Sequence, residues 1–318
     1  VPQAQLLKLL EGWIGEGIGM DCSIIPSKKY KDLFVVSTID FFYPLVEDPY
    51  LQGRIACANV LSDMYAMGVF DIDNVLMALA VSMDMKPADQ EVCTKLLIRG
   101  FNVQTCRNPS LGRLNAPHLL QGGQTILNPS PIIGGVAKSI CKQGDFIMPT
   151  GAQVGDLIVL TKPLGTQVAV NVKQWSHNEE KWNLKVKDTI TKELGMRAYR
   201  AASENMARLN RNASRLMHTH KARAATDVTG FGIMGHASNL ASNQKAAVSF
   251  RIHTLPIIKS GMADVNRVSN FRLTLGYSAE TSGGLFICLP KENAPKYIED
   301  LEAVDGKPAW IVGEVIEG

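Results

Sequence analysis

The 318-residue sequence lacks the features that mark several large classes of protein. It contains no uninterrupted apolar run of the roughly 20 residues that a bilayer-spanning helix needs. Its charge is nearly balanced, with 33 basic and 30 acidic residues and a formal net charge of +3. Nothing in this balance favours nucleic-acid binding or attachment to a membrane surface. With 46% hydrophobic and 20% charged residues, the composition predicts a soluble globular protein.

Cysteine is sparse and scattered. The six cysteines form no C-x-x-C pair and no close Cys/His cluster of the kind that zinc sites use, so we expect reduced, mostly packed thiols. No signal peptide opens the chain, because residues 1–13 have the apolar spacing of an amphipathic helix. The expected compartment is therefore the cytoplasm. Because the first residue is Val1, we also expect that residues upstream of it have been removed.

Two familiar nucleotide-binding signatures are missing as well. The sequence has no G-x-x-x-x-G-K-[ST] loop and lacks the set of protein-kinase motifs. Residues 230–235 do fit G-x-G-x-x-G, but no acidic residue stands about twenty positions further on, so this lone match is weak support for a dinucleotide site. If the protein uses ATP, another arrangement must bind it.

The spacing of apolar residues indicates strands and helices in both halves of the chain, so each half is predicted to have mixed α and β structure. In the first half, strands are predicted at 33–36, 74–83 and 132–141. Helices are predicted at 50–68 and 88–101. Gly68 and Gly100 stand near the ends of these helices, where glycine is favoured. The polar segment 102–120 has no clear periodicity and is predicted to be a surface insertion.

The second half repeats the mixture of strands and helices. Strands are predicted at 157–161, 248–253, 285–289 and 310–317. Helices are predicted at 167–175, 190–217 and 294–301. Between the halves, Pro149, Gly151 and Gly155 interrupt the periodic segments. We therefore predict two domains, 1–149 and 150–318.

Four aspartates stand out by their positions. Asp21 follows a glycine cluster, and Asp40 ends the hydrophobic strand that begins with the apolar run 33–36. Asp63 lies on a predicted helix four residues after Asn59, so both project from one face. Asp227 comes directly before a Val-Thr-Gly turn. Each alone is more simply explained as a turn or helix cap or as a solvent-facing residue. Together they fit magnesium, which takes a few carboxylates and completes its shell with water and phosphate.

Glycine-rich turns near these aspartates suggest where phosphate would bind. Backbone N–H groups in such turns and at helix starts bind phosphate oxygens. A further segment offers exposed backbone together with an amide and a hydroxyl, namely Gly122, Gly123, Gln124 and Thr125. The sequence therefore predicts a magnesium site that holds the phosphates of a nucleotide.

Several motifs together resemble the eukaryotic selenophosphate synthetases. They are GMD at 19–21, TIDFFYP at 38–44, GRIACANVLSD at 53–63, GGQTILNP at 122–129, TKPLGT at 161–166, TDVTGFG at 226–232 and ETSGG at 280–284. The resemblance runs nearly from end to end. The Thr-Gly-Phe-Gly and Thr-Ser-Gly-Gly elements also belong to the wider superfamily that contains aminoimidazole ribonucleotide synthetase.

The resemblance implies a two-domain, mixed α/β fold of the aminoimidazole ribonucleotide synthetase type. The N-terminal domain, 1–149, would bind ATP and Mg²⁺ and form a β-barrel across a homodimer, and 150–318 would be a C-terminal α/β domain. The implied reaction converts ATP, selenide and water to selenophosphate, AMP and orthophosphate. The family also uses K⁺, to which no residue of this sequence can be assigned.

By matching position, the resemblance also implies roles for particular residues. Its implied magnesium ligands are Asp21, Asp40, Asp63 and Asp227, with Thr38 and Asn59 supporting them. The implied nucleotide contacts include Gly19 and Met20. They also include Gly122, Gly123, Gln124 and Thr125, which would come from the same subunit or from its partner.

One departure from the family concerns selenium. The family carries a reactive cysteine or selenocysteine, and then a phosphate-binding lysine, just before the Val-Pro-Gln with which this sequence opens, and neither has a counterpart here. Cys22 adjoins Asp21, but a neighbouring carboxylate raises the pKa of a thiol, so we do not assign it this role. We therefore assign no catalytic residue and expect these 318 residues alone to make no selenophosphate.

Two other hypotheses stay open. The chain could be a catalytically silent homologue that binds nucleotide or a partner, or a purine-pathway ATP-dependent ligase of the same superfamily. A second departure, the longer segment 102–120, has no assigned effect. The histidines His118, His218 and His220 are predicted to be core or surface residues and not ligands, because i, i+2 spacing on a helix separates the last two.

Overall fold

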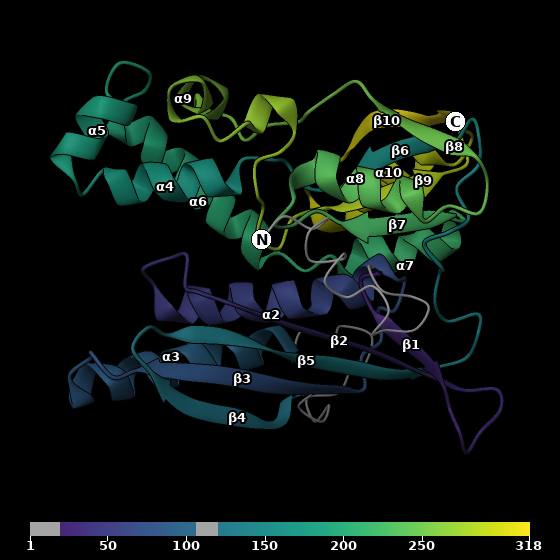
Figure 1. The fold of residues 1–318 in the computed structure, drawn as a ribbon, viewed down its shortest axis with the longest axis horizontal. Coiled ribbons are helices and arrows are strands. Elements are labelled where there is room, and N and C mark those ends of the chain that lie inside the picture. Colours follow the sequence, from purple (N-terminus) through teal and green to yellow (C-terminus); the bar gives the residue numbers. More distant parts are fainter. Residues whose placement is uncertain (1–19, 106–119) are drawn as a thin grey trace.

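The computed structural model describes residues 20–105 and 120–318, which fold around two five-stranded sheets (Figure 1). The predicted opening helix at 1–13, together with Gly19, His118 and most of the predicted insertion, lies outside the described residues. Mixed α and β structure was predicted for both halves, and this is confirmed. Within the described part, no helix combines the length and apolar character needed to cross a bilayer.

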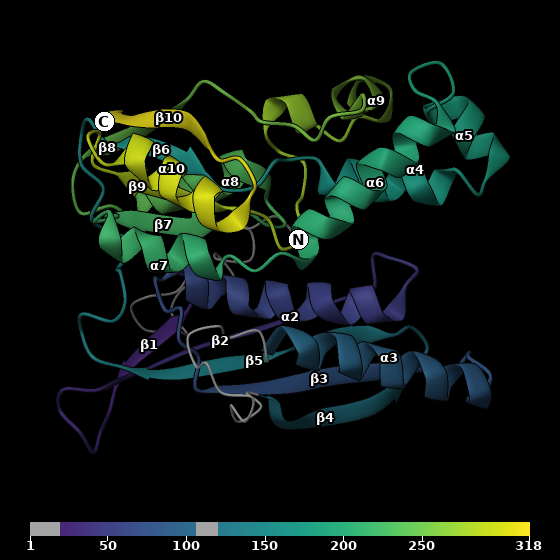
Figure 2. The same cartoon turned by 180° about the vertical axis from the view of Figure 1, so that it is seen from behind.

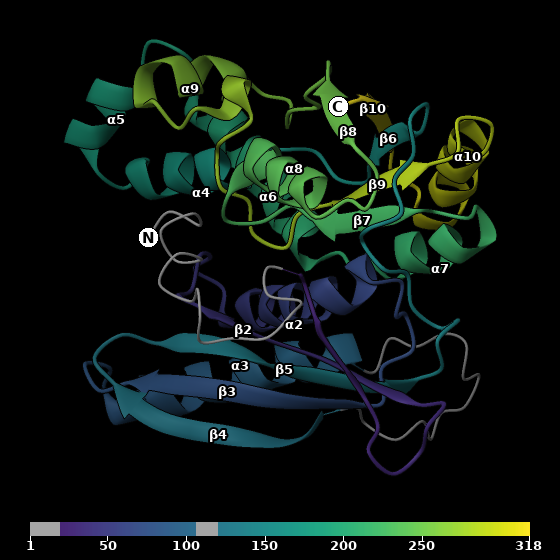
Figure 3. The same cartoon turned by 45° about the vertical axis from the view of Figure 1, so that its right-hand side comes forward.

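The N-terminal sheet has the strand order β1-β2-β5-β3-β4. Its strands are β1 (Ser23–Pro26), β2 (Phe34–Phe42), β3 (Asn74–Ser82), β4 (Leu120–Asn128) and β5 (Ile132–Cys141). All neighbours are antiparallel except β3 and β4, which are parallel. Two helices, α2 (Pro49–Ala66) and α3 (Pro87–Thr105), cover one face of this sheet (Figure 3).

One strand prediction in this domain needs correction. The strand predicted from the apolar run 33–36 continues to Phe42, so Asp40 lies inside β2 and does not end it. Residues 122–125, predicted to offer exposed backbone, lie on the edge strand β4 and are exposed there. Gly122 and Gly123 nevertheless have positive φ angles of 152° and 158°, which glycine adopts easily and other residues rarely do. The periodicity signal failed because glycine has low intrinsic preference for strands.

The C-terminal sheet is wholly antiparallel, with the order β7-β9-β6-β10-β8. Its strands are β6 (Leu157–Leu160), β7 (Ala224–Asp227), β8 (Val248–Ile252), β9 (Leu285–Leu289) and β10 (Trp310–Glu317). Helices lie on both of its faces (Figures 1 and 2). Every residue of β9 is therefore buried, which explains why its sequence is continuously apolar and does not alternate.

Seven described helices belong to the C-terminal half. They are α4 (Thr166–Trp175), α5 (Glu179–Lys185), α6 (Lys192–Ala207), α7 (Arg211–Thr219), α8 (Gly232–Ser242), α9 (Met262–Ser269) and α10 (Ala294–Asp305), with a short 3-10 turn η2 (Leu273–Leu275). The single helical stretch predicted at 190–217 is divided into α6 and α7. At the division, Asn210 takes non-helical backbone angles and binds Ser62 and the Gly283 carbonyl.

Helix α2 lies between the two sheets (Figure 3). It is buried on most of its circumference because it packs on the N-terminal sheet on one side and towards β7, α6 and α7 on the other. One continuous cluster of buried apolar side chains runs from Val36 on β2, through α2, to Tyr297 on α10. A helix that is buried all round can present polar side chains to both domains, and α2 does so near its C-terminal end.

Gly100 has a different role from the one predicted. It lies inside α3 and not at its end, because α3 continues to Thr105. A Cβ atom at Gly100 would lie only 1.9 Å from the Tyr50 carbonyl oxygen, and one at Gly53 only 2.1 Å from the Leu97 carbonyl oxygen. The two glycines therefore permit α2 and α3 to touch backbone to backbone.

We accordingly predict that Gly100→Ala lowers the free energy of unfolding by at least about 1–3 kcal/mol, the usual cost of forcing extra atoms into a packed contact. Urea denaturation measures this. Gly144→Ala is the matched control, because a Cβ atom at Gly144 would meet nothing within 4 Å. Equal stability of the two variants would show that the helices can separate without cost.

Candidate active site

Three of the predicted aspartates converge where α2 meets β7. Asp21 comes from the segment before β1, Asp63 from α2 and Asp227 from the end of β7. Each offers one carboxylate oxygen to a group in which all these atoms lie within 4.8 Å of one another. Residues more than 200 positions apart in the sequence thus form one cluster, which joins the two domains.

Asp40 lies beside this group on β2. It points to the helix-covered face of the N-terminal sheet, where Asn59 Nδ2 of α2 donates a hydrogen bond of 2.8 Å to Asp40 Oδ2. Asn59 Oδ1 in turn accepts a hydrogen bond of 2.8 Å from the backbone N–H of Ser282 in the C-terminal half. Asn59 therefore orients Asp40 and is itself held by the other domain, which is the supporting position predicted for it.

Thr38 supports a second carboxylate from the same strand. Its hydroxyl donates a short hydrogen bond to Asp63 Oδ2. Thr38 and Asp40 are two residues apart on β2, so their side chains project from one face of the sheet towards α2. This alternation places both predicted residues at the cluster.

The remaining two carboxylates are held by residues that sequence reasoning missed. Thr226 Oγ1 donates a hydrogen bond of 3.0 Å to Asp21 Oδ1. Ser62 forms a hydrogen bond with Asp227 that lowers its pKa. Asp227 Oδ2, however, is buried and has no hydrogen-bond partner among the described residues. A buried carboxylate oxygen without a donor is costly, so this atom needs a ligand that the described side chains do not supply.

Burial raises the pKa of all four carboxyl groups, and repulsion from Asp227 adds to this for the other three. Burial is the largest cause in each case. The neighbouring charge of Asp227 raises the pKa of Asp21, Asp40 and Asp63 further. The pKa of Asp40 rises to about 7 and that of Asp227 to about 6. Four anionic groups this close destabilise one another unless protons or a cation neutralise them.

A divalent cation fits this donor set. Magnesium prefers oxygen ligands and commonly uses a few carboxylates, leaving positions for water and phosphate. A hollow of about 430 Å³ lies directly against Asp21, Thr38 and Asp63. This space is large enough for a metal ion with part of a ligand beside it. The unpartnered Asp227 Oδ2 and the raised pKa values are the two observations that favour an ion here.

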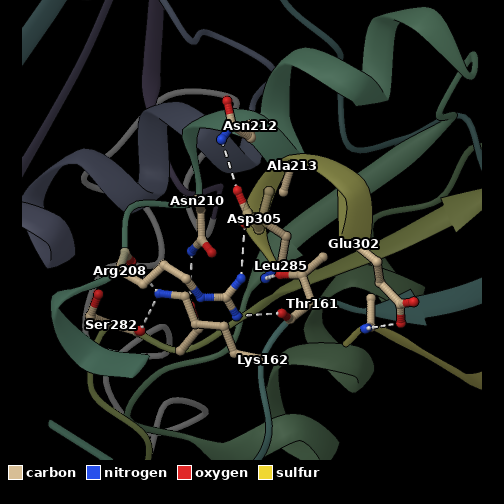
Figure 4. A network of polar contacts seen from close by, with 12 residues as sticks. Thr161, Lys162, Arg208, Asn210, Asn212, Ala213, Ser282, Leu285, Glu302 and Asp305 are labelled. Carbon is tan, nitrogen blue, oxygen red and sulfur yellow. Dashed lines mark hydrogen bonds and ion pairs between the residues drawn. The ribbon is translucent and has the colours of Figure 1, made fainter. Parts of the chain in front are cut away.

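A buried lysine connects the cluster to the rest of the C-terminal domain (Figure 4). Lys162 is only 2% exposed, and its Nζ donates hydrogen bonds of 2.6 Å to the Arg208 carbonyl and 2.8 Å to the Ser282 carbonyl. Burial and the Arg208 charge lower its pKa, and the charge of Asp227 acts in the opposite direction. Lys162 thereby fixes the Ser282 segment, whose N–H holds Asn59. The sequence signal for Lys162 was only its place in the 161–166 motif.

The other predicted nucleotide contacts do not join the cluster within one chain. Met20 adjoins Asp21, but residues 122–125 lie on β4, which β5 and β3 separate from β2. At about 4.8 Å between neighbouring strands, this places β4 roughly 14 Å from β2. Whether any of these residues binds nucleotide stays a prediction.

Cys22, His218 and His220 have surroundings that favour a structural role. Cys22 is buried, and burial together with the Asp63 charge raises the pKa of its thiol well above the ordinary value. His218 Nε2 lies 2.8 Å from the Gly68 carbonyl oxygen, and His220 Nε2 lies 2.9 Å from Asp300 Oδ2. Both contacts are structural, as predicted for these two histidines.

Comparison with known proteins defines the class first. The N-terminal domain of AIR synthase related proteins matches residues 19–139, and the C-terminal domain of the same class matches residues 153–318. Thiamine monophosphate kinase from Aquifex aeolicus has the same fold, with a TM-score of 0.69 and 15% identity over 99% of this chain and 94% of its own. The hydrogenase maturation protein HypE from E. coli gives a TM-score of 0.64 at 13% identity, over 89% and 80% of the two chains.

Sequence relatives narrow the class. The selenide, water dikinase of Dictyostelium discoideum is 50% identical over 318 residues, which are 100% of this chain and 84% of that protein. Selenide, water dikinase 2 of Mus musculus is 53% identical over 305 residues, or 95% of this chain and 65% of that protein. The chain therefore belongs to the selenide, water dikinases, a family of enzymes within the AIR synthase related class.

Proposed function

We propose that this chain takes part in the reaction that converts ATP, selenide and water to selenophosphate, AMP and orthophosphate, and that the aspartate cluster is its magnesium–ATP centre. The observation that carries the proposal is the convergence of Asp21, Asp63 and Asp227 within 4.8 Å, with Asp40 beside them. The relatives' name supports the reaction. It favours a dikinase over the purine-pathway ligase that the sequence left open.

In this proposal Asp21, Asp40, Asp63 and Asp227 hold Mg²⁺. The bound ion would neutralise the charge that builds up on the phosphates as they are cleaved. Thr38, Asn59, Ser62 and Thr226 keep the four carboxylates in place through the hydrogen bonds described above. K⁺ has no assigned ligand among the described residues and forms no part of the proposed centre.

We also propose that the chain works as a homodimer. Opposite α2 and α3, the other face of the N-terminal sheet is covered by none of the described segments. It carries exposed apolar side chains on four strands: Ile25, Val35, Ile39, Phe41, Ile126 and Ile140. A contiguous apolar face of this kind is typical of an interaction surface. A second copy packed on this sheet would bring its own residues 122–125 to the site, which would explain why they lie far from the cluster in one chain.

Phe41→Asp tests the dimer. Phe41 is 64% exposed on this face, so a charge there should leave the fold intact and prevent a second copy from packing. Light scattering should report a dimer for the unmodified chain and a monomer for Phe41→Asp. Leu184→Asp is the matched control, because Leu184 is 70% exposed on α5 and remote from this sheet. A monomeric unmodified chain would contradict the proposal.

The selenium-handling group is proposed to be the cysteine or selenocysteine that the family carries ahead of the residue matching Val1. None of the described cysteines is a good substitute. Four of the five are buried, and the pKa of Cys22, Cys141 and Cys288 is raised, mainly by burial. A raised pKa keeps these groups as thiols, whereas the thiolate is the nucleophile.

Phosphorus NMR with ATP, Mg²⁺ and selenide tests the function. We expect these 318 residues to bind Mg–ATP and to give no selenophosphate signal. A chimera that places the family's cysteine- and lysine-bearing segment ahead of Val1 should give selenophosphate, AMP and orthophosphate. The same chimera with Asp227→Asn should give none. A folded chimera that binds Mg–ATP without producing selenophosphate would favour a catalytically silent homologue.

A further inference from the structure

A second cavity lies on another side of α2, away from the aspartate cluster. Its volume is about 810 Å³, within the range of about 300–1,000 Å³ that is usual for small-molecule sites. Residues of both domains line it, from α2, α3, α6, α7 and the C-terminal end of α10. It shares no lining residue with the hollow beside Asp21 and Asp63. The cavity is therefore a separate site at the junction of the domains.

Positive charge dominates its wall. Four arginines line it, and only two acidic residues do, Glu204 and Asp305. The arginines are Arg54, Arg200, Arg208 and Arg211. Asp305 Oδ2 pairs with Arg208 at 2.9 Å, Arg211 pairs with Asp71 outside the wall at 2.8 Å, and Glu204 approaches Lys307 at 3.7 Å. The wall keeps a net positive charge, and guanidinium groups match phosphate oxygens in geometry as well as in charge.

Among the buried polar atoms of this wall without a hydrogen-bond partner in the described part of the chain, two suit a ligand. One is the donor Arg208 Nε, and the other is the acceptor Gln104 Oε1. Gln104 is only 2% exposed, and its Nε2 already donates to the Ala207 carbonyl, so the free oxygen is fixed in place. Unpaired buried groups are rare in proteins and mark places where a missing partner belongs. This wall therefore offers both a donor for an anion and an acceptor for a hydroxyl group.

The rest of the lining is mainly apolar or aromatic, with Ser203 and Asn212 as its polar members. Leu51, Tyr199, Ala207 and Leu209 face the same space as the arginines. Tyr199 is half-buried and offers a ring surface. Sites for small organic ligands typically combine such a surface with a few placed polar groups.

We propose that this cavity binds a phosphate ester that carries hydroxyl groups and a flat, weakly polar ring, with a nucleoside monophosphate as the representative ligand. The arginines take the phosphate, Gln104 accepts from a hydroxyl, and the apolar lining covers the ring. Arg208 belongs both to this cavity and to the network around Lys162 (Figure 4), because its carbonyl accepts from Lys162 Nζ and its Nη2 donates to the Thr161 carbonyl at 2.8 Å. Arg208 alone therefore separates a ligand in this cavity from the Lys162 network that supports the aspartate cluster.

Calorimetric titration of AMP into the 318-residue chain tests the proposal, in low-salt buffer with a chelator so that no divalent ion is present. We expect saturable binding, little binding of adenosine, and weaker binding of inorganic phosphate. Arg200→Gln should weaken AMP binding about tenfold or more, the effect of losing a hydrogen bond to a charged group. Arg200 is exposed on α6, so this change should not disturb the fold.

Two controls separate this site from the aspartate cluster. Arg197→Gln changes an exposed arginine on the same helix that does not line the cavity, and it should leave the affinity unchanged. Asp227→Asn should also leave metal-free AMP binding in place. Absence of saturable binding, or equal affinity of the Arg200→Gln and Arg197→Gln proteins, would overturn the proposal. Inorganic phosphate that binds as tightly as AMP would overturn the assignment to an ester.

Discussion

Replacing Asp227 by Asn is expected to abolish magnesium-dependent nucleotide binding and, at the same time, to stabilise the metal-free protein. Asp227 is the carboxylate whose charge raises the pKa of the other three and whose Oδ2 lacks a partner. Even residues outside the first coordination shell of a metal cost about 10- to 100-fold in affinity when changed, so loss of a direct ligand should reach or exceed the upper figure. Calorimetry with Mg²⁺ and a non-hydrolysable ATP analogue measures it.

The stabilising effect has a definite pH dependence. The pKa of Asp40 is raised to about 7 and that of Asp227 to about 6 in the folded protein, both above the ordinary value near 3.8. Protonation therefore favours the folded state, and this contribution is complete below about pH 4 and is lost as the pH rises through about 6–7. Metal-free wild type should lose stability between pH 5 and pH 8 (roughly the span of these titrations), and Asp227→Asn should lose less.

Comparing wild type with Asp227→Asn removes the contribution of other titrating groups to the pH dependence of stability. Glu280, whose pKa burial raises to about 7, titrates in the same direction in both. Saturating Mg²⁺ should reverse the loss in wild type and have little effect on the variant, because a ligand that binds only the folded state stabilises it. Parallel pH profiles for the two metal-free proteins would mean that the four carboxylates are not electrostatically coupled.

Lys162→Met is expected to lower the free energy of unfolding by about 2–5 kcal/mol, because the buried carbonyl oxygens of Arg208 and Ser282 would each lose the donor that Nζ provides. Methionine fills a similar volume, so the loss reflects polar contacts and not a cavity. The change should also weaken Mg–nucleotide binding, since Ser282 would no longer be held against Asn59. Guanidinium denaturation and calorimetry on the same protein measure the two effects.

Lys187→Met is the matched control for this prediction. Lys187 is exposed and forms no ion pair with the described residues. The same substitution there should therefore change the free energy of unfolding by less than about 0.5 kcal/mol. If Lys162→Met is as stable as this control, the two carbonyl groups must find other donors. Loss of stability with unchanged Mg–nucleotide affinity would separate Lys162 from the site.

Elements with a clear apolar pattern were predictable from the sequence, whereas elements without one were not. The strand Ile132–Cys141 and the helix Pro49–Ala66 agree with prediction because long apolar patterns determine both. Strand β7 was missed because Ala224–Asp227 has only four residues and no alternation. Asp40 was placed at the end of a strand because an aspartate inside a strand is unfavourable by itself. Asn59, from α2, supplies the hydrogen bond that compensates.

The candidate site was predictable in composition but not in assembly. The motifs identified the four aspartates together with Thr38 and Asn59, which lie at the cluster. No local pattern indicated that Ser62, Thr226 and Lys162 would support them, because a serine, a threonine and a lysine acquire this role only through burial beside the carboxylates. The separation of residues 122–125 from the cluster also depends on strand order, which sequence periodicity does not specify.

The metal itself provides the most direct test of the magnesium–ATP centre. Crystals grown with Mn²⁺ and a non-hydrolysable ATP analogue would reveal the ion by its anomalous scattering. A manganese peak bound by Asp21, Asp63 and Asp227, with nucleotide phosphate on its open side, is the predicted result. A nucleotide bound elsewhere, or manganese absent from these three carboxylates at saturating concentration, would contradict the assignment.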